Sequence, residues 1–167
     1  MSAVILLINP KYPHNVAQVI RACAAYGAHE VVFTGERMLR KLEAMDRIPR
    51  EERMKGYSKV KWRHIVRPFD EFEGLGYIPV CVEVRQNSEM LPAFVHPPVA
   101  LYVFGPEDGS IGSVVARHCH RFLAIPTDHC INLSMAVGTV LYDRRAKRQP
   151  DYRMDMALTE NRGYVDE

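Results

Sequence analysis

Short apolar runs separated by stretches with helical spacing are the feature that most constrains how this chain can fold. This alternation is typical of an α/β domain with a mainly parallel sheet flanked by helices. A run at Lys61–Val66 has the weakest pattern, and a loop or a sheet edge is the alternative there, because its apolar residues do not alternate cleanly with polar ones. The expected strands are Ala3–Ile8, Glu30–Phe33, Lys61–Val66, Ile78–Val84, Val99–Phe104 and Phe122–Ile125.

Between the strands, apolar side chains recur at helical spacing. The first of these stretches carries Arg21 among small and apolar neighbours, with Asn15 as the predicted N-cap and Gly27 as the C-terminal stop. Arg21 lies about 100° round the helix from Ile20, which places it beside the apolar stripe rather than on it. The expected helices are Asn15–Tyr26, one in or around Arg37–Lys55, one around Pro68–Glu73, Ile111–His120 and Leu133–Lys147.

The size and composition of the chain are those of a soluble globular domain. It has 167 residues, of which 47% are hydrophobic and 25% charged, so we expect one domain over residues 1–167 with a full core. No apolar run approaches the roughly 20 residues of a membrane helix, and the first ten residues lack the features of a signal peptide. These observations predict a cytoplasmic protein that does not bind membranes.

The cysteines do not predict a disulfide framework or a metal centre. Four cysteines are scattered without a CxxC pair, which favours reduced thiols. A cluster of possible zinc ligands has spacings that match no structural zinc pattern, so no metal is expected. The cluster consists of His118, Cys119, His120, His129 and Cys130.

Positive charge is concentrated in two segments. From Arg37 to Arg67 there are eleven Lys or Arg residues and four Asp or Glu residues, a net charge of +7. Such segments are usually solvated faces, but two of them beside aromatic residues indicate a phosphate-rich partner such as RNA. The second segment contains Arg144, Arg145, Lys147, Arg148 and Arg153.

Three stretches share the order strand, polar turn, helix: LLINPKYPHNV, LYVFGPEDGSIG and FLAIPTDHCINLS. Ligands bind at the carboxyl ends of strands in open α/β sheets, so the three turns should meet at one edge. None contains the GxGxxG dinucleotide fingerprint, the GxxxxGK[ST] phosphate loop or the GxSxG elbow. A dehydrogenase, a P-loop nucleotidase and an α/β-hydrolase therefore lack local support.

Taken together, the three stretches resemble the motifs of the SpoU or TrmH-like branch of the SPOUT RNA methyltransferases. The first motif is an Asn with an Arg six residues later, matched by Asn15 and Arg21, and the second is FGPE, ending at Glu107. The third is Ile-Pro followed by N-L-S, matched from Ile125 to Ser134. The order and spacing agree over nearly the whole chain. Its length is most similar to that of the stand-alone tRNA ribose methyltransferases, which include wobble-position enzymes.

The resemblance implies an α/β fold whose C-terminal segment forms a deep trefoil knot, a feature that periodicity could not have suggested. It also implies S-adenosylmethionine as cofactor, tRNA as the substrate RNA, and a homodimer. Methylation of rRNA ribose and a catalytically silent RNA-binding module are the alternatives, together with base N-methylation or an unrelated nucleotide-binding or metal-binding protein. The cofactor contacts carried over are Val82, Glu83, Gly105, Ile125, Cys130 and Leu133.

The resemblance further implies transfer of a methyl group to a ribose 2′-hydroxyl. An alcohol is a weak nucleophile, so the site must stabilise its partial negative charge. Arg21 is expected to do this, in its own subunit or across a dimer, because a guanidinium seldom gives up its proton. Asn15 and Ser134 are expected to position ribose or phosphate. Glu107 is expected to orient Arg21 or a loop amide, and Asn132 to hold the knot loop and substrate. Helix capping and a solvated turn are the structural alternatives for these four.

Overall fold

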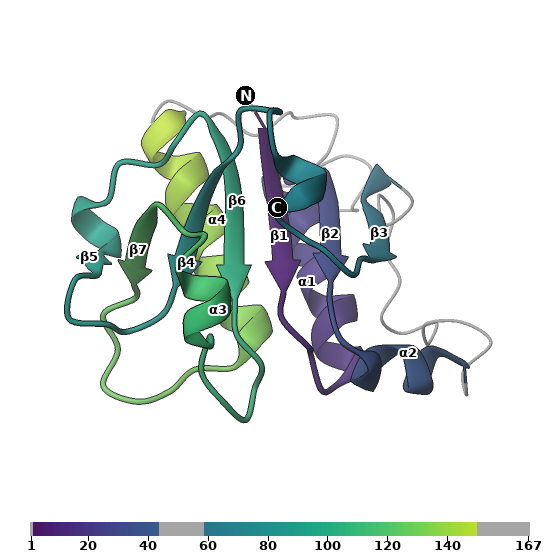
Figure 1. Ribbon diagram of the computed structural model, residues 1–167. Helices are drawn as coiled ribbons and strands as arrows, with labels where there is room; N and C mark the ends of the chain where they lie inside the picture. Colours follow the sequence, from purple (N-terminus) through teal and green to yellow (C-terminus); the bar gives the residue numbers. More distant parts are fainter. Residues whose placement is uncertain (1, 44–58, 150–167) are drawn as a thin grey trace, which may run out of the picture.

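The computed structural model describes residues 2–43 and 59–149, which form a single sheet with helices on both faces (Figure 1). The strand order is β3-β2-β1-β6-β4-β7-β5, and each pairing between them is parallel. The predicted α/β class is therefore confirmed. The strands are β1 (Ser2–Leu7), β2 (Glu30–Phe33), β3 (Lys61–His64), β4 (Ile78–Val82), β5 (Glu89–Met90), β6 (Val99–Phe104) and β7 (Arg121–Ala124).

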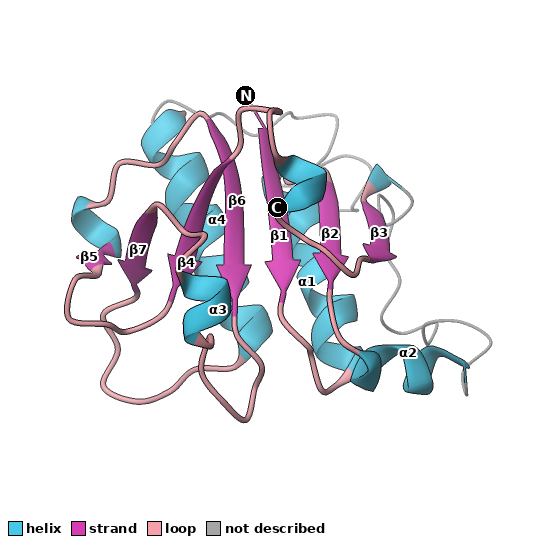
Figure 2. Ribbon diagram, viewed as in Figure 1, coloured by secondary structure: helices cyan, strands magenta, loops and turns pink. Residues whose placement is uncertain are grey.

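Helices cover both faces of this sheet. The two long helices lie side by side on one face, while α3 lies on the other (Figure 2). Parallel strands buried on both faces read as continuous apolar runs, which is why the central strands β1 and β6 were clear in the sequence. The helices are α1 (Pro13–Tyr26), α2 (Glu36–Glu43), α3 (Ser113–Ala116) and α4 (Leu133–Arg148), with short 3-10 turns η3 (Asp70–Phe72) and η4 (Leu91–Ala93).

The core has two layers, one on each side of the sheet. The larger layer joins α1 and α4 to the sheet through side chains such as Ile20, Val137 and Tyr102, all fully buried. The smaller layer packs Phe72 and Ile111 against the opposite face. Burial of this apolar surface fixes α1 and α4 against the strands whose carboxyl ends carry the site.

The first helix begins two residues earlier than predicted. Asn15 is not its N-cap: α1 starts at Pro13, and Tyr12 occupies the cap position with an extended backbone. Proline suits the first turn of a helix because its missing N–H would have no helical partner there. Asn15 therefore lies inside the first turn and is buried. Its side chain is free to bond across the sheet edge instead of to its own helix.

Several predicted bounds were too long. The helix expected at Ile111–His120 is only Ser113–Ala116, because the backbone of Ile111 is bonded to the turn after β4. The helix expected around Pro68–Glu73 is only the three-residue 3-10 turn η3. Of the helix expected around Arg37–Lys55, the described part is α2, while residues 44–58 lie outside the described residues. The strands β3 and β4 end at His64 and Val82, two residues earlier than predicted.

The chain between β4 and β6 holds elements that the sequence did not reveal. The strand β5 has two residues and the turn η4 has three, so neither is long enough to show periodicity. The helical phase of α1 was predicted correctly, since Arg21 is exposed while Val16, Ile20 and Cys23 are buried.

Four further observations concern the described residues only. All four cysteines are free thiols, and Cys130 alone among them is exposed. No group of His, Cys, Asp and Glu side chains in these segments could hold a metal ion. None of the helices in the described segments combines the length and apolar character needed to cross a membrane.

Candidate active site

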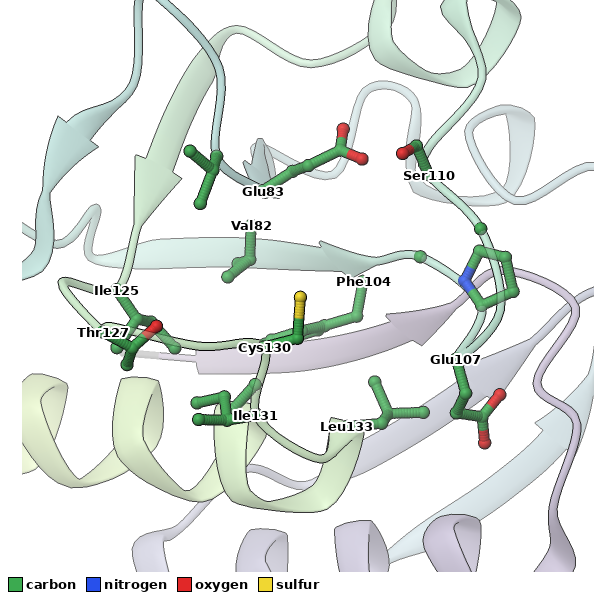
Figure 3. Close-up of a pocket in the computed structure, with 15 residues that line it drawn as sticks. Val82, Glu83, Phe104, Glu107, Ser110, Ile125, Thr127, Cys130, Ile131 and Leu133 are labelled. Atoms are coloured by element: carbon green, nitrogen blue, oxygen red, sulfur yellow. The ribbon is translucent and has the colours of Figure 1, made fainter.

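A cavity of about 370 Å³ opens where the strands β4, β6 and β7 end (Figure 3). These three strands are neighbours in the sheet, so the turns that follow them meet at one edge. The first turn of α4 closes the cavity from the side. Its volume lies in the range typical of small-molecule sites. The turns predicted to converge from the FGPE and INLS stretches do meet here.

The cavity wall contains all six residues carried over as cofactor contacts, Val82, Glu83, Gly105, Ile125, Cys130 and Leu133. Its floor is apolar, formed by Val82, Phe104 and Leu133 among others, and polar groups stand on its rim. Sequence reasoning missed other wall residues, although most lie within or beside the same turns. These are Val84, Phe104, Pro106, Gly109, Ser110, Thr127, Ile131 and Ala136.

Gly105, directly after β6, is constrained by close packing. A Cβ atom added there would lie 3.1 Å from Cγ1 of Ile111 and 3.3 Å from its backbone nitrogen. Contacts of that length require Ile111 to move by a few tenths of an ångström. A side chain at position 105 would therefore disturb the turn that forms one wall of the cavity. Glycine keeps this turn folded back against the end of β6.

Glu83 braces the turn after β6 from the neighbouring strand end. One carboxylate oxygen accepts the Ile111 amide proton over 2.9 Å, and the other accepts from Nε of Arg85 over 2.8 Å. Arg85 also donates to the carbonyl oxygen of Ile111. Glu83 and Arg85 thus hold the backbone N–H and the backbone carbonyl of the same residue, Ile111. The backbone of Glu83 is engaged as well, since its N–H donates to Leu123 and its carbonyl accepts from Ser88.

Four of the five predicted catalytic residues form one chain of hydrogen bonds. Nδ2 of Asn15 donates to Oε1 of Glu107 over 2.7 Å, and Nδ2 of Asn132 donates to Oδ1 of Asn15 over 3.0 Å. Oδ1 of Asn132 accepts from both the amide and the hydroxyl of Ser134, over 2.8 and 2.7 Å. This chain links the three sequence motifs side by side. Capping, the structural alternative for Asn132, is observed, because this residue is the N-cap of α4.

Glu107 also fastens the turn between β1 and α1. Its carboxylate accepts the backbone N–H groups of Lys11, over 2.7 Å, and Tyr12, over 3.3 Å. Glu107 therefore orients loop amides, one of its two predicted roles. Partial burial raises the pKa of Glu107, but the hydrogen bonds from Asn15 and from these amides lower it by more, so the pKa lies below its ordinary value. The group is a carboxylate at neutral pH, with its charged end directed away from the cavity (Figure 3).

The next residue, Asp108, joins the turn between β1 and α1 to the helix α2. Its two oxygens accept a bidentate pair of hydrogen bonds from Arg37, over 2.9 and 3.0 Å, and one of them lies 3.1 Å from Nζ of Lys11. Hydrogen bonds from Arg37 and Lys11 lower the pKa of Asp108 to about 2. Glu107 and Asp108 thus hold two different segments, the turn between β1 and α1 and the helix α2, against the turn after β6.

Arg21 is not part of this polar chain. It is exposed on α1, and neither Glu107 nor any other described residue forms a hydrogen bond or ion pair with it. Six residues separate it from Asn15, so it lies about 9 Å further along the helix, away from the sheet edge. The prediction that Glu107 orients Arg21 is therefore wrong within a single chain.

The described members of the second basic cluster are largely structural, while Arg153 lies outside the described residues. Arg144 is 5% exposed and donates to three backbone carbonyls and to the hydroxyl of Tyr102. Lys147 donates to the carbonyls of Leu91 and Phe94. These cations lie near the C-terminal end of α4, where positive charge is favoured by the helix dipole. Because these cations fasten α4 to the loop before β6, an RNA partner is not needed to explain why they are there.

An apolar floor with a glycine-containing turn beside it suits a small organic ligand, and the comparisons with known proteins agree with a cofactor site here. Residues 2–142 match the model of the SpoU rRNA Methylase family. The tRNA (cytidine-2′-O-)-methyltransferase TrmJ of Methanocaldococcus jannaschii is 24% identical over 172 aligned positions, covering 93% of this chain and 73% of TrmJ.

Two solved structures share the fold. The A. aeolicus TrmH/SpoU tRNA modifying enzyme superposes with a TM-score of 0.74 at 18% identity, covering 89% of this chain and 76% of its own. The SpoU methyltransferase AviRb from Streptomyces viridochromogenes, solved with the cofactor AdoMet, gives 0.68 at 17% identity, covering 90% and 58%. The match of the family model spans most of the chain and includes all three motif regions. The protein therefore belongs to the SpoU rRNA methylase family.

Proposed function

We propose that this protein is an S-adenosylmethionine-dependent methyltransferase that modifies a ribose 2′-hydroxyl of tRNA. The observation that carries the proposal is the hydrogen-bonded chain Ser134, Asn132, Asn15, Glu107 beside a cavity at the carboxyl edge of the sheet. Family membership supports methyl transfer to RNA, and the names of TrmJ and of the A. aeolicus enzyme favour tRNA over rRNA.

The residues of the cavity fit the proposed cofactor. The apolar floor around Val82, Ile125 and Leu133 suits an adenine ring, and the turn after Gly105 offers backbone groups to a bent, polar molecule. Glu83 is better placed to brace the wall than to bind, because both of its carboxylate oxygens already have partners. When bound, S-adenosylmethionine supplies an electrophilic methyl group.

The polar chain positions the nucleophile in this proposal. Asn15 and Asn132 hold each other, so neither amide can rotate without breaking a bond to Glu107 or to the first turn of α4. The hydroxyl of Ser134 lies on that turn and donates its proton to Asn132, so its oxygen can accept a hydrogen bond from a ribose hydroxyl. A rigid polar edge of this kind lowers the entropy lost when the ribose is aligned.

Arg21 serves the site of a second subunit in this proposal. It points away from its own polar chain, on the exposed side of α1 with Ala24 and Ala25. The neighbouring helix α4 exposes Met135 and Tyr142, which are 61% and 58% exposed. An outer face of small and apolar residues on two packed helices suits a homodimer. There Arg21 would stabilise the developing negative charge on the 2′-oxygen and bind the adjacent phosphate.

The decisive experiment for activity incubates the protein with methyl-labelled S-adenosylmethionine and either bulk tRNA or rRNA, followed by digestion to nucleosides. Label in 2′-O-methyl nucleosides of tRNA is the expected result. Label in the ribose of rRNA would show that rRNA and not tRNA is the substrate. Label on a base would overturn the proposal that the methyl group is transferred to ribose. Cofactor binding without any transfer would identify a silent RNA-binding module.

Subunit complementation tests the role of Arg21. Co-expression of an Arg21→Ala chain with a Cys130→Trp chain, whose indole fills the cavity, produces mixed dimers. If Arg21 acts across the interface, each mixed dimer holds one intact site, and activity recovers to about a quarter of the wild-type value. If Arg21 acts within its own chain, the mixture stays inactive. Each variant alone is the control and should be inactive.

Four further features complete the proposal. The chain acts as one SPOUT domain over residues 1–167, and its C-terminal segment is threaded as a trefoil knot. A tRNA substrate favours the cytoplasmic location that the composition predicts. Cations of the basic segment such as Arg37 and Arg63 are already ion-paired, so its phosphate contacts would come from other positions.

A further inference from the structure

The turn between β1 and α1 carries an exposed aromatic pair that neither the core nor the cavity uses. Tyr12 is 38% exposed, and its ring stacks with the ring of His14, with centroids 5.3 Å apart and planes inclined by 26°. His14 is exposed as well. Tyr12 occupies the N-cap position of α1 but makes no capping hydrogen bond with its side chain. Helix formation therefore does not explain an aromatic residue here.

Positive charge surrounds the Tyr12 ring. Nζ of Lys11 lies 5.3 Å and Nζ of Lys41 lies 5.1 Å from the ring centroid. Lys11 is paired with Asp108, whereas Lys41 donates to the carbonyl oxygen of Lys11 and has no carboxylate partner among the described residues. An aromatic surface beside an uncompensated ammonium group matches a nucleotide, which presents a flat base and a negative phosphate together.

The aromatic pair is fixed to the polar chain of the candidate site. The backbone N–H groups of Lys11 and Tyr12 both donate to Glu107, which also binds Asn15. Tyr12 is therefore held at the rim of the edge where the ribose would be aligned. Because its backbone is anchored before any ligand arrives, a base stacked on this pair would lose little further protein entropy on binding.

We propose that Tyr12 and His14 form a stacking subsite for an unpaired nucleobase of the substrate RNA, with Lys41 binding a phosphate of the same strand. This inference rests on the proposed function. It adds the part of the protein that selects a single-stranded region of the substrate RNA. Stacking on an aromatic ring tolerates any base and needs the base to be outside a duplex. The subsite thus favours an RNA loop over a paired stem.

The test compares Tyr12→Ala, Tyr12→Phe and a matched control, Leu75→Ala. Leu75 is another exposed apolar residue, 63% exposed, and lies just before β4 at the opposite end of the strands. For Tyr12→Ala we expect the KM for RNA to rise by about tenfold, the range that loss of one stacked base produces. The dissociation constant for S-adenosylmethionine and the Tm should stay unchanged. Tyr12→Phe, which keeps the ring, should restore the KM to within about twofold.

Direct binding separates this inference from the proposed function. An RNA hairpin with 2-aminopurine in its loop reports stacking by fluorescence quenching, whether or not methyl transfer occurs. Quenching that is lost in Tyr12→Ala and kept in Leu75→Ala supports the subsite. In Lys41→Ala, the dependence of log affinity on log salt should weaken by about one unit.

Three results would overturn the subsite. An unchanged KM and unchanged quenching in Tyr12→Ala would show that no base stacks there. A lower Tm or weaker cofactor binding in Tyr12→Ala would show that the ring only stabilises the turn. A shift of the monomer–dimer equilibrium in Tyr12→Ala would show that a second copy of the chain covers it. If wild-type protein quenches the loop signal without methylating RNA, the proposed activity fails while the subsite stands.

Discussion

Replacement of Glu107 by alanine should loosen the whole candidate site at once. Its carboxylate accepts hydrogen bonds from the Lys11 amide and the Asn15 side chain, both over 2.7 Å, and a longer one from the Tyr12 amide over 3.3 Å. In Glu107→Ala, three donors lose their acceptor together. No other carboxylate is bonded to these groups among the residues that the structure describes.

The expected loss of stability follows from these contacts. Hydrogen bonds to a charged acceptor contribute about 1.5 to 3 kcal/mol each when buried, and Glu107 is only partly buried, so the two short bonds together contribute about 3 kcal/mol. For a domain of this size, about 3 kcal/mol corresponds to a fall in Tm of roughly 6 to 12 °C. The Tm of Glu107→Gln should lie between those of the wild type and Glu107→Ala, because the amide NH₂ group of the glutamine would face one of the three donors.

Differential scanning fluorimetry measures the effect, with Asp108→Ala as the matched control in the adjacent position. Asp108 is exposed and makes only surface ion pairs, so its loss should change the Tm little. The pKa of Glu107 is lowered on folding, so its contribution is present above the unfolded pKa and is lost as the pH falls through the folded pKa. The difference in Tm between wild type and Glu107→Ala should therefore shrink in acid. Equal Tm values for Glu107→Ala and Asp108→Ala at neutral pH would refute the reasoning.

Three further predictions concern the cavity and the core. Gly105→Ala should weaken S-adenosylmethionine binding by about tenfold in calorimetry, because the new Cβ displaces Ile111 and the cavity wall, whereas Gly109→Ala, whose Cβ would lie 3.5 Å from Pro106, should have little effect. Iodoacetamide should alkylate Cys130 alone under native conditions, and saturating S-adenosylmethionine should slow this reaction, as followed by peptide mass spectrometry; equal rates with and without cofactor would contradict its place in the wall. Burial lowers the pKa of His96 against the opposing effect of Asp143, so folding favours the neutral ring, and the Tm should fall as the pH drops below the ordinary imidazole pKa of about 6.5. A His96→Gln variant should lose this part of the pH dependence.

The sequence predicted the parts of the fold that depend on local pattern. The central strands were correct to within a residue or two, and α4 was correct to within one residue, because long apolar runs and helical stripes are strong signals. The strand β5 and the turn η4 were missed because their few residues carry no period. The start of α1 was misplaced because an Asn near a helix start is usually a cap, and here Pro13 moves the boundary upstream.

The sequence indicated which residues belong to the candidate site, but not the hydrogen bonds that join them. The six wall residues came from a resemblance to a family, and the structure gathers them around one cavity. Their bonding could not be predicted, because Glu107 and Asn15 are 92 residues apart and Asn15 and Asn132 are 117 apart. Glu83 illustrates the limit: its position on the cavity was predicted, yet its brace with Arg85 around Ile111 depends on side-chain geometry that no spacing encodes.

The opposite placements of Glu107 and Arg21 are the main argument for the proposal that a second subunit supplies a cation to the site. A carboxylate with a lowered pKa, surrounded by donors, can fix a loop but cannot stabilise negative charge that develops on an attacking oxygen. The hydrogen-bonded chain beside the cavity consists of Ser134, Asn132, Asn15 and Glu107, and none of these four residues carries a positive charge. Arg21 has the required charge but lies on the outer face of α1, about 9 Å along the helix from Asn15. A dimer that packs this face against a partner's cavity edge would bring the missing cation to the nucleophile, and each subunit would then complete the site of the other.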